Sequence, residues 1–176
     1  MATSLDQFEI RPVLFVEQRA EYIKPIKGLV GTLNHVEMSV VPDALQALST
    51  LKSSPDFYHL VMSGPLTSEM YGEEMARRIK EGDPKMPVIM LDEWDWVKSE
   101  RWGIHANEVP RGIAAAIQAG YVDLFYGYPI GADHQQTIHG FVDDIRRLQQ
   151  LKLEPPDTRS LLQKVAHRLG RRLIAA

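Results

Sequence analysis

Acidic side chains that could bind a cation or take part in proton transfer follow two short apolar runs of this chain. Glu17 comes directly after the run PVLFV at 12–16, and Asp92 comes directly after MPVIML at 86–91. If both runs are strands of one parallel sheet, their carboxyl ends meet at the same edge, where such folds place functional residues. The two carboxylates could then share a divalent ion. Because they have no third partner, a solvated acidic rim is the better interpretation, and we predict no metal site.

Other catalytic chemistry has little support in the sequence. The chain has no cysteine, which excludes disulfides, thiolate metal ligands and cysteine nucleophiles. Its histidines are scattered, and the closest two, His134 and His139, are five residues apart, whereas a helix face repeats every three or four. No glycine-rich phosphate loop or nucleophile elbow occurs. We therefore predict neither an enzyme nor a bound cofactor, although a Ser-His-Asp triad is not excluded.

Length and composition indicate one soluble domain with an appendage. The chain has 176 residues, of which 44% are hydrophobic, so it can bury a proper core. Its formal net charge of −3 argues against binding nucleic acid or an acidic membrane over the whole surface. The first eleven residues are polar and do not form a signal peptide, and no apolar stretch approaches the roughly 20 residues of a membrane span. We expect a cytoplasmic protein.

Short apolar runs alternate with segments of helical periodicity along most of the chain. Asp43 is a candidate N-cap, Gly120 a candidate helix stop, and Pro25 must lie in the first turn of its helix or break it. Strict alternation predicts an α/β fold, a flavodoxin-like, doubly wound, five-stranded parallel sheet. Strands are expected at 12–16, 36–41, 58–62, 86–91 and 122–126, and helices at 20–33, 44–51, 73–80, 110–119 and 134–151.

Two segments go beyond a minimal domain of this kind. The connection 92–108 after the fourth strand is long and contains every tryptophan of the chain. After a linker at 152–157, the segment 158–176 is expected to form an amphipathic helix with a partly basic face. We therefore divide the chain into an N-terminal extension at 1–10, a domain at 11–151, the linker and the C-terminal helix.

The ends of the predicted strands resemble those of receiver domains of response regulators. In that family the first strand ends in two acids that hold magnesium, and here the residues are Glu17 and Gln18. The third strand ends in the phosphoacceptor aspartate, followed by a loop that closes in Met-x-Gly. The run SGPLTSEMYG keeps Met70 and Gly72, and counting back from them places Gly64 at the acceptor position.

Two further strand ends complete the resemblance, which covers 11–151. The fourth strand ends in a threonine or serine in the family and in Asp92 here. The fifth ends in a lysine before a proline in the family and in Tyr128 before Pro129 here. Gly120 and Asp123 also match the family's Gly-Ala-x-Asp approach to the fifth strand. Another flavodoxin-like domain with a coincidental Met-x-Gly is the alternative.

These differences remove the chemistry that the resemblance implies. Phosphoryl transfer needs a carboxylate nucleophile, a metal ion and a nearby cation. Gly64 has no nucleophile, and shifting the alignment by one offers only Ser63, which lacks a neighbouring base. Gln18 and Tyr128 each lack the charge of the family residue, and Asp92 adds negative charge where a phosphoryl group would need stabilisation. The resemblance therefore implies a pseudo-receiver, which we predict to be a signalling or scaffold protein independent of phosphorylation.

A protein partner, and a homodimer, are the expected interactions, because aromatic residues and arginine are favoured interface anchors. The alternative for the tryptophans is that they fold inward and pin the long connection onto the domain. The candidate interface residues are Trp94, Trp96, Arg101, Trp102, Phe125 and Tyr126.

Two other functions stay open at this point. One is a small-molecule-binding or enzymatic flavodoxin-like domain that uses the crevice near Glu17, Gly64 and Asp92. The other is a transcriptional regulator that binds DNA through the basic C-terminal helix, although a single helix on a net acidic chain makes nucleic-acid binding the weaker expectation.

Overall fold

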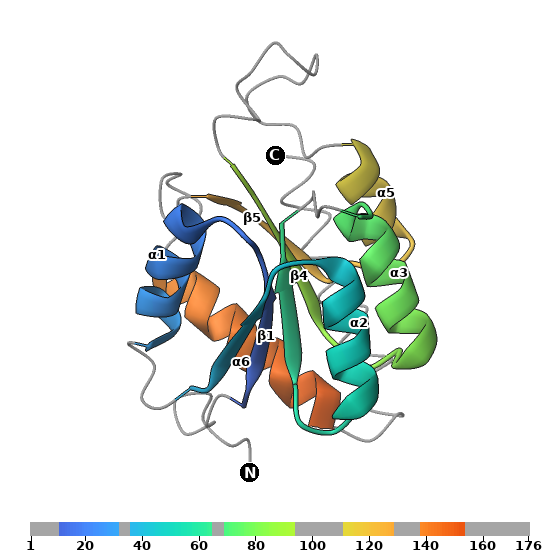
Figure 1. Ribbon diagram of the computed structural model, residues 1–176, viewed down its shortest axis with the longest axis horizontal. Coiled ribbons are helices and arrows are strands. Elements are labelled where there is room, and N and C mark those ends of the chain that lie inside the picture. Colours follow the sequence, from blue (N-terminus) through green and yellow to red (C-terminus); the bar gives the residue numbers. More distant parts are fainter. Residues whose placement is uncertain (1–10, 32–35, 65–68, 94–110, 129–137, 154–176) are drawn as a thin grey trace.

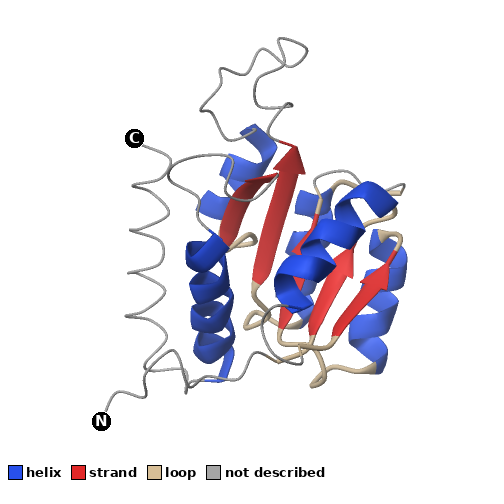
Figure 2. Cartoon of the chain, turned by 90° about the vertical axis from the view of Figure 1, so that its left-hand side faces the viewer, coloured by secondary structure: helices blue, strands red, loops and turns tan. Residues whose placement is uncertain are grey.

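The computed structural model describes residues 11–31, 36–64, 69–93, 111–128 and 138–153, which form a five-stranded parallel sheet with helices on both faces (Figures 1 and 2). The strand order is β2-β1-β3-β4-β5, the order of flavodoxin-like folds. The predicted fold class is therefore confirmed. The strands are β1 Val13–Val16, β2 Met38–Val41, β3 Leu60–Ser63, β4 Val88–Glu93 and β5 Leu124–Tyr128.

The helices form two layers that cover opposite faces of this sheet (Figure 1). One layer consists of α2, α3 and α5, and the other consists of α1 and α6. The apolar residues of the two groups accordingly pack into separate core clusters. The helix bounds are α1 Ala20–Gly31, α2 Ala44–Ser53, α3 Gly72–Gly82, α5 Arg111–Gln118 and α6 Ile138–Leu153.

Alternation of side chains along the central strands produces these two clusters. In β1, Leu14 and Val16 pack on the side of α2 and α3, whereas Val13 and Phe15 pack on the side of α1 and α6. All four side chains are buried. A strand that is covered on both faces reads as a continuous apolar run, as 12–16 does in the sequence.

Two of the predicted helix signals are confirmed, and one is wrong. Asp43 caps α2, since its Oδ1 accepts a 2.8 Å hydrogen bond from the Gln46 N–H. Gly120 follows α5 with φ +79°, a left-handed conformation that favours glycine. Pro25 neither starts nor breaks its helix but lies inside α1. Proline there removes the hydrogen bond to the carbonyl of Glu21, and because both residues are exposed, water can bind that carbonyl instead.

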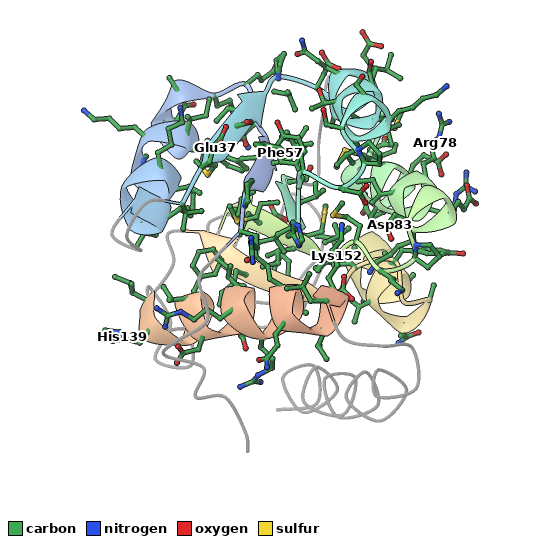
Figure 3. All side chains as sticks on the ribbon, turned by 90° about the horizontal axis from the view of Figure 1, so that it is seen from below. Glu37, Phe57, Arg78, Asp83, His139 and Lys152 are labelled. Atoms are coloured by element: carbon green, nitrogen blue, oxygen red, sulfur yellow. The ribbon has the colours of Figure 1, made fainter. Side chains whose placement is uncertain are left out.

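Polar contacts at the edge where the strands begin tie α6 to the sheet. Gln149 is fully buried, and its side chain donates to the Arg11 carbonyl and accepts from the Arg11 N–H. Lys152 donates to the Tyr58 carbonyl at 2.9 Å and forms an ion pair with Asp83 at 3.1 Å. Figure 3 shows Lys152 close to Asp83 at this edge. The candidate site lies at the opposite edge of the sheet, where the strands end.

Candidate functional site

Gly64 follows the last residue of β3 and lies at the carboxyl edge of the sheet between β1 and β4. The preceding residue, Ser63, pairs with Val16 on one side and Met90 on the other. A Cβ atom at Gly64 would lie 3.3 Å from Oε2 of Glu17 and 3.8 Å from the Leu91 carbonyl oxygen. The alternative nucleophile, Ser63, is fully buried, and its hydroxyl donates to the Gly64 carbonyl at 2.8 Å.

Glu17 follows the last residue of β1, and both oxygens of its buried carboxylate accept hydrogen bonds from the chain itself. Its Oε1 accepts from the backbone N–H groups of Gln18 and Arg19 and from the Arg19 side-chain Nε, each at 3.0 Å. Its Oε2 accepts from Arg19 Nη2 at 2.9 Å. Both carboxylate oxygens are thus bound to one guanidinium, which is the strong, two-point geometry of an arginine–carboxylate pair.

Arg19 is a site residue that the sequence analysis did not identify. Its guanidinium carbon lies 4.0 Å from the ring centroid of Tyr22, in the first turn of α1, so a cation–π contact supports the ion pair with Glu17. A Cβ atom at Gly64 would also lie 3.8 Å from Arg19 Nη2. The available signal was a basic residue two positions after the strand-end acid, with an aromatic three positions further along the helix.

Asp92 lies near the end of β4, opposite Gly127 of β5, and is buried. It lines one small pocket together with Glu17 and Arg19, so the two carboxylates predicted to meet at this edge do so. The pocket also has an apolar wall. Its lining residues are Phe15, Glu17, Arg19, Tyr22, Ile26, Leu91 and Asp92.

Two other predicted site residues, Tyr128 and Gln18, are also at this edge of the sheet. The backbone of Tyr128 ends β5 and pairs with Glu93, which puts it at the same edge, one position beyond the Asp92–Gly127 pair. Gln18 is exposed and contributes its backbone N–H to Glu17. The carboxyl edge therefore brings Glu17, Gly64 and Asp92 together and adds Arg19.

The candidate interface residues that the structure describes lie largely inside the domain. Tyr126 is buried in the cluster between the sheet and α6, with its ring 4.9 Å from Phe141 in an edge-to-face arrangement. Burial, followed by its hydrogen bond to the Asp144 carboxylate, raises the pKa of the Tyr126 phenol. Phe125 is partly buried against the other cluster. In this conformation neither ring is a fully exposed anchor.

Several predictions fall outside the described residues. They concern the N-terminal extension at 1–10, the tryptophan-bearing connection from residue 94 onward with its candidate interface residues, the linker beyond Leu153 and the C-terminal helix at 158–176; Lys152 and Leu153, assigned to the linker, belong to α6. Within the described ranges, no helix is long and apolar enough to cross a membrane.

The residues at this edge do not fit a magnesium ion of the kind that receiver domains bind. Hard cations take oxygen ligands from several carboxylates, carbonyls and waters. Both oxygens of Glu17 instead accept hydrogen bonds from Arg19, and Gln18 replaces the second acid. Over the part of the chain that the structure describes, no group of three or more Asp, Glu, His or Cys side chains is placed to hold a metal ion.

A five-stranded parallel sheet in the order 2-1-3-4-5, with Glu17 after β1 lying beside the end of β3, is an arrangement that flavodoxin-like folds share, receiver domains among them. A search with protein-family models finds no match, and no curated protein matches the sequence. The solved structures, in contrast, contain clear matches.

Receiver domains and an adenylate cyclase are among these similar structures. A response regulator receiver domain protein from Clostridium thermocellum is 15% identical, with 81% of this chain and 96% of that chain covered and a TM-score of 0.62. The signal receiver domain of an HD domain-containing protein from Pseudomonas fluorescens Pf-5 is 20% identical, covering 86% and 93%, with a TM-score of 0.61. An adenylate cyclase from Rhodopirellula baltica is 17% identical, covering 88% and 98%, with a TM-score of 0.62.

The chain therefore has the receiver fold, as the strand ends predicted. At these levels of identity the likeness establishes the fold, and the chemistry has to be argued from the site itself.

Proposed function

We propose that this chain is a pseudo-receiver, a signalling or scaffold module that acts through protein contacts and without phosphorylation. The observation that carries the proposal is Gly64 at the end of β3, with the Glu17 carboxylate 3.3 Å from the place of its missing Cβ atom. Phosphoryl transfer to a receiver needs a nucleophile at that place. Glycine supplies none, and the hydroxyl of Ser63 is buried and bonded to a carbonyl.

The surroundings of Gly64 support the same conclusion. Asp92 is buried near the end of β4, so its carboxylate opposes the negative charge of an incoming phosphoryl group. Arg19 already compensates the charge of Glu17. A site with this charge distribution does not favour a phosphoryl dianion, whereas it is compatible with a fixed surface for another protein.

The fold supports a signalling role, since receiver domains are among the structures that this chain resembles. We propose that residues 11–151 carry the function as a homodimer with a protein partner, and that the tryptophans at 94, 96 and 102 contribute to the contact. The segments outside that range are then an N-terminal extension, a linker and a C-terminal helix.

A phosphodonor assay on the full chain tests the phosphorylation part. The protein is incubated with acetyl phosphate and excess Mg²⁺, and its intact mass is measured at intervals. A receiver domain that keeps its aspartate, treated in parallel, is the positive control. We expect no added phosphoryl group on this chain while the control is modified. Stoichiometric acyl phosphate on this chain would overturn the proposal.

Sedimentation equilibrium over a wide concentration range tests the dimer separately. A mass of two chains with a concentration-dependent dissociation is expected. A single-chain mass at every concentration contradicts the homodimer and leaves the phosphodonor result unaffected.

A further inference from the structure

The Arg19 side chain lies at the carboxyl edge of the sheet, where the resemblance to receiver domains implies a divalent ion. Its guanidinium binds both oxygens of Glu17, at 3.0 Å through Nε and 2.9 Å through Nη2. It also lines the same pocket as the second buried carboxylate, Asp92. In a metal centre the cation is a separate ion, whereas here the cation is a side chain of the protein itself.

We propose that Arg19 is a built-in counter-ion that replaces the divalent metal and keeps this edge in one fixed electrostatic state. A metal ion exchanges with solvent, and its affinity depends on its concentration. A guanidinium two residues from its carboxylate is always present, and it stays protonated at any physiological pH. The edge then needs neither metal nor phosphate to reach its working state.

Two contacts and the missing side chain at Gly64 allow the guanidinium to take this role. The Arg19 backbone N–H donates to the same Oε1 that its Nε contacts, which fixes the turn after β1 around the carboxylate. Tyr22 supports the guanidinium from α1 through a cation–π contact of 4.0 Å. The absent side chain at Gly64 leaves the space beside Glu17 Oε2 and Arg19 Nη2 open, whereas a Cβ atom would press on the first at 3.3 Å.

Charge at this edge explains why a cation is needed at all. A buried carboxylate that loses its partner is strongly destabilising, since burial removes the water that would stabilise its charge. Glu17 and Asp92 are both buried, at 8% and 5% exposed. Removal of the guanidinium therefore leaves the buried Glu17 carboxylate without its ion-pair partner, and a bound cation could take over that role.

The inference predicts a latent metal response that one substitution uncovers. Arg19→Met keeps an unbranched apolar stem but removes the positive charge. We expect the melting temperature of the wild-type full chain to be the same in Mn²⁺ as in EDTA. We expect the Arg19→Met variant to melt about 5 °C or more below wild type in EDTA, and to recover part of that loss in millimolar Mn²⁺.

Matched variants separate this effect from general surface binding. Glu17→Gln combined with Arg19→Met removes the charge that the ion would meet, so Mn²⁺ should no longer raise its melting temperature. Arg19→Lys keeps a tethered cation and should stay insensitive to Mn²⁺. A metal response that persists in the Glu17→Gln, Arg19→Met variant, or an Arg19→Met variant with no response, would overturn the inference.

A measurement on the wild-type chain covers the case in which Arg19→Met does not fold. Paramagnetic Mn²⁺ broadens the NMR signals of nearby amides. We expect the amides of Glu17, Gly64 and Asp92 to keep their linewidths. Selective broadening of these three signals would show a metal bound beside Arg19 and would overturn the inference.

The inference rests on the proposed function for its meaning in signalling, but its test uses no phosphodonor. Acyl phosphate on the wild-type chain would contradict the proposed function. The metal response of the Arg19→Met variant would still test the inference independently.

Discussion

Gly112 of α5 and Glu73 of α3 approach so closely that a Cβ atom at position 112 would overlap Oε1 of Glu73. Oε2 of the same carboxylate is buried and has no hydrogen-bond partner within the described residues. The contact joins two neighbouring helices of one layer, and the second of them follows the tryptophan-bearing segment. Because Oε1 is the far end of a flexible side chain, a Cβ atom at position 112 requires the Glu73 carboxylate to move.

A double-mutant cycle measures this relationship. In the Glu73→Ala background, Gly112→Ala should stabilise the chain by up to about 1 kcal/mol, because alanine is the better helix former. In the wild-type background the new methyl group displaces the Glu73 carboxylate, which offsets that gain. We expect a coupling free energy of at least about 0.5 kcal/mol from urea unfolding. Additive effects of the two substitutions would show that the contact carries no energy.

The space at Gly64 allows a similar test at the candidate site. Gly64→Ala places a methyl group 3.3 Å from Glu17 Oε2, which is held by Arg19 and has little freedom to move. We expect destabilisation by about 1 kcal/mol, the lower end of the range for overpacking.

Gly28→Ala in α1 is the matched control for Gly64→Ala, since nothing lies within 4 Å of a Cβ atom there. It should stabilise by up to about 1 kcal/mol, as expected for alanine in a helix. Thermal unfolding of both variants compares the two sites directly. Equal effects at positions 64 and 28 would contradict the packing described around Glu17.

The Asp123 side chain, directly before β5, accepts two hydrogen bonds from neighbouring elements. It accepts from the Val88 N–H and from Lys80 Nζ, both at 2.7 Å. The Lys80 side chain is largely buried. Asp123→Asn should therefore lower the free energy of unfolding by roughly 1–3 kcal/mol, because the Lys80 ammonium loses its negatively charged partner.

The more exposed pair formed by Asp143 and Arg146 is the comparison for Asp123→Asn. Its ion-pair distance is 3.4 Å, and the Asp143 side chain is 50% exposed. Asp143→Asn should change the free energy of unfolding by less than about 1 kcal/mol. A loss at position 143 as large as that at 123 would contradict this ranking.

His59 should make stability depend on pH below neutrality. Burial, with smaller contributions from the positive charges of Lys152 and Arg11, lowers the pKa of His59 below its usual value of 6.5. The unfolded chain then binds a proton more readily than the folded chain. The stabilising contribution is complete above pH 6.5 and is lost as the pH falls from 6.5 toward the lower folded pKa.

Urea unfolding at pH 7.5 and at steps down to pH 5.0 measures this dependence. His59→Gln should lose less stability over that range than wild type. His139→Gln, at an exposed position of α6, should follow the wild-type curve. Parallel curves for the wild type and His59→Gln would rule out His59 as the source.

Much of the fold could be predicted because its signals are local in the chain. Five apolar runs alternate with helical periodicity, Asp43 caps α2 through a residue three positions away, and Gly120 takes the left-handed conformation that ends α5. The strand ends also gave the positions of Glu17, Gly64 and Asp92 at one edge. In a parallel sheet these positions follow from strand order alone.

Tertiary structure decided what depends on side-chain direction and on burial. Pro25 is tolerated inside α1 because it faces solvent, and Tyr126 packs inward because α6 places Phe141 and Asp144 against it. The sequence analysis did not identify Arg19, because its contact with Glu17 also depends on side-chain direction.

The sequence by itself determined that the residue after the third strand, at position 64, is glycine, since residue identity is independent of folding. Only the tertiary structure decided that Arg19 turns back onto Glu17. That contact depends on the backbone turn after β1, on the position of Tyr22 and on the burial of the carboxylate. A buried charge needs a nearby compensating partner, and which partner is near depends on the folded chain.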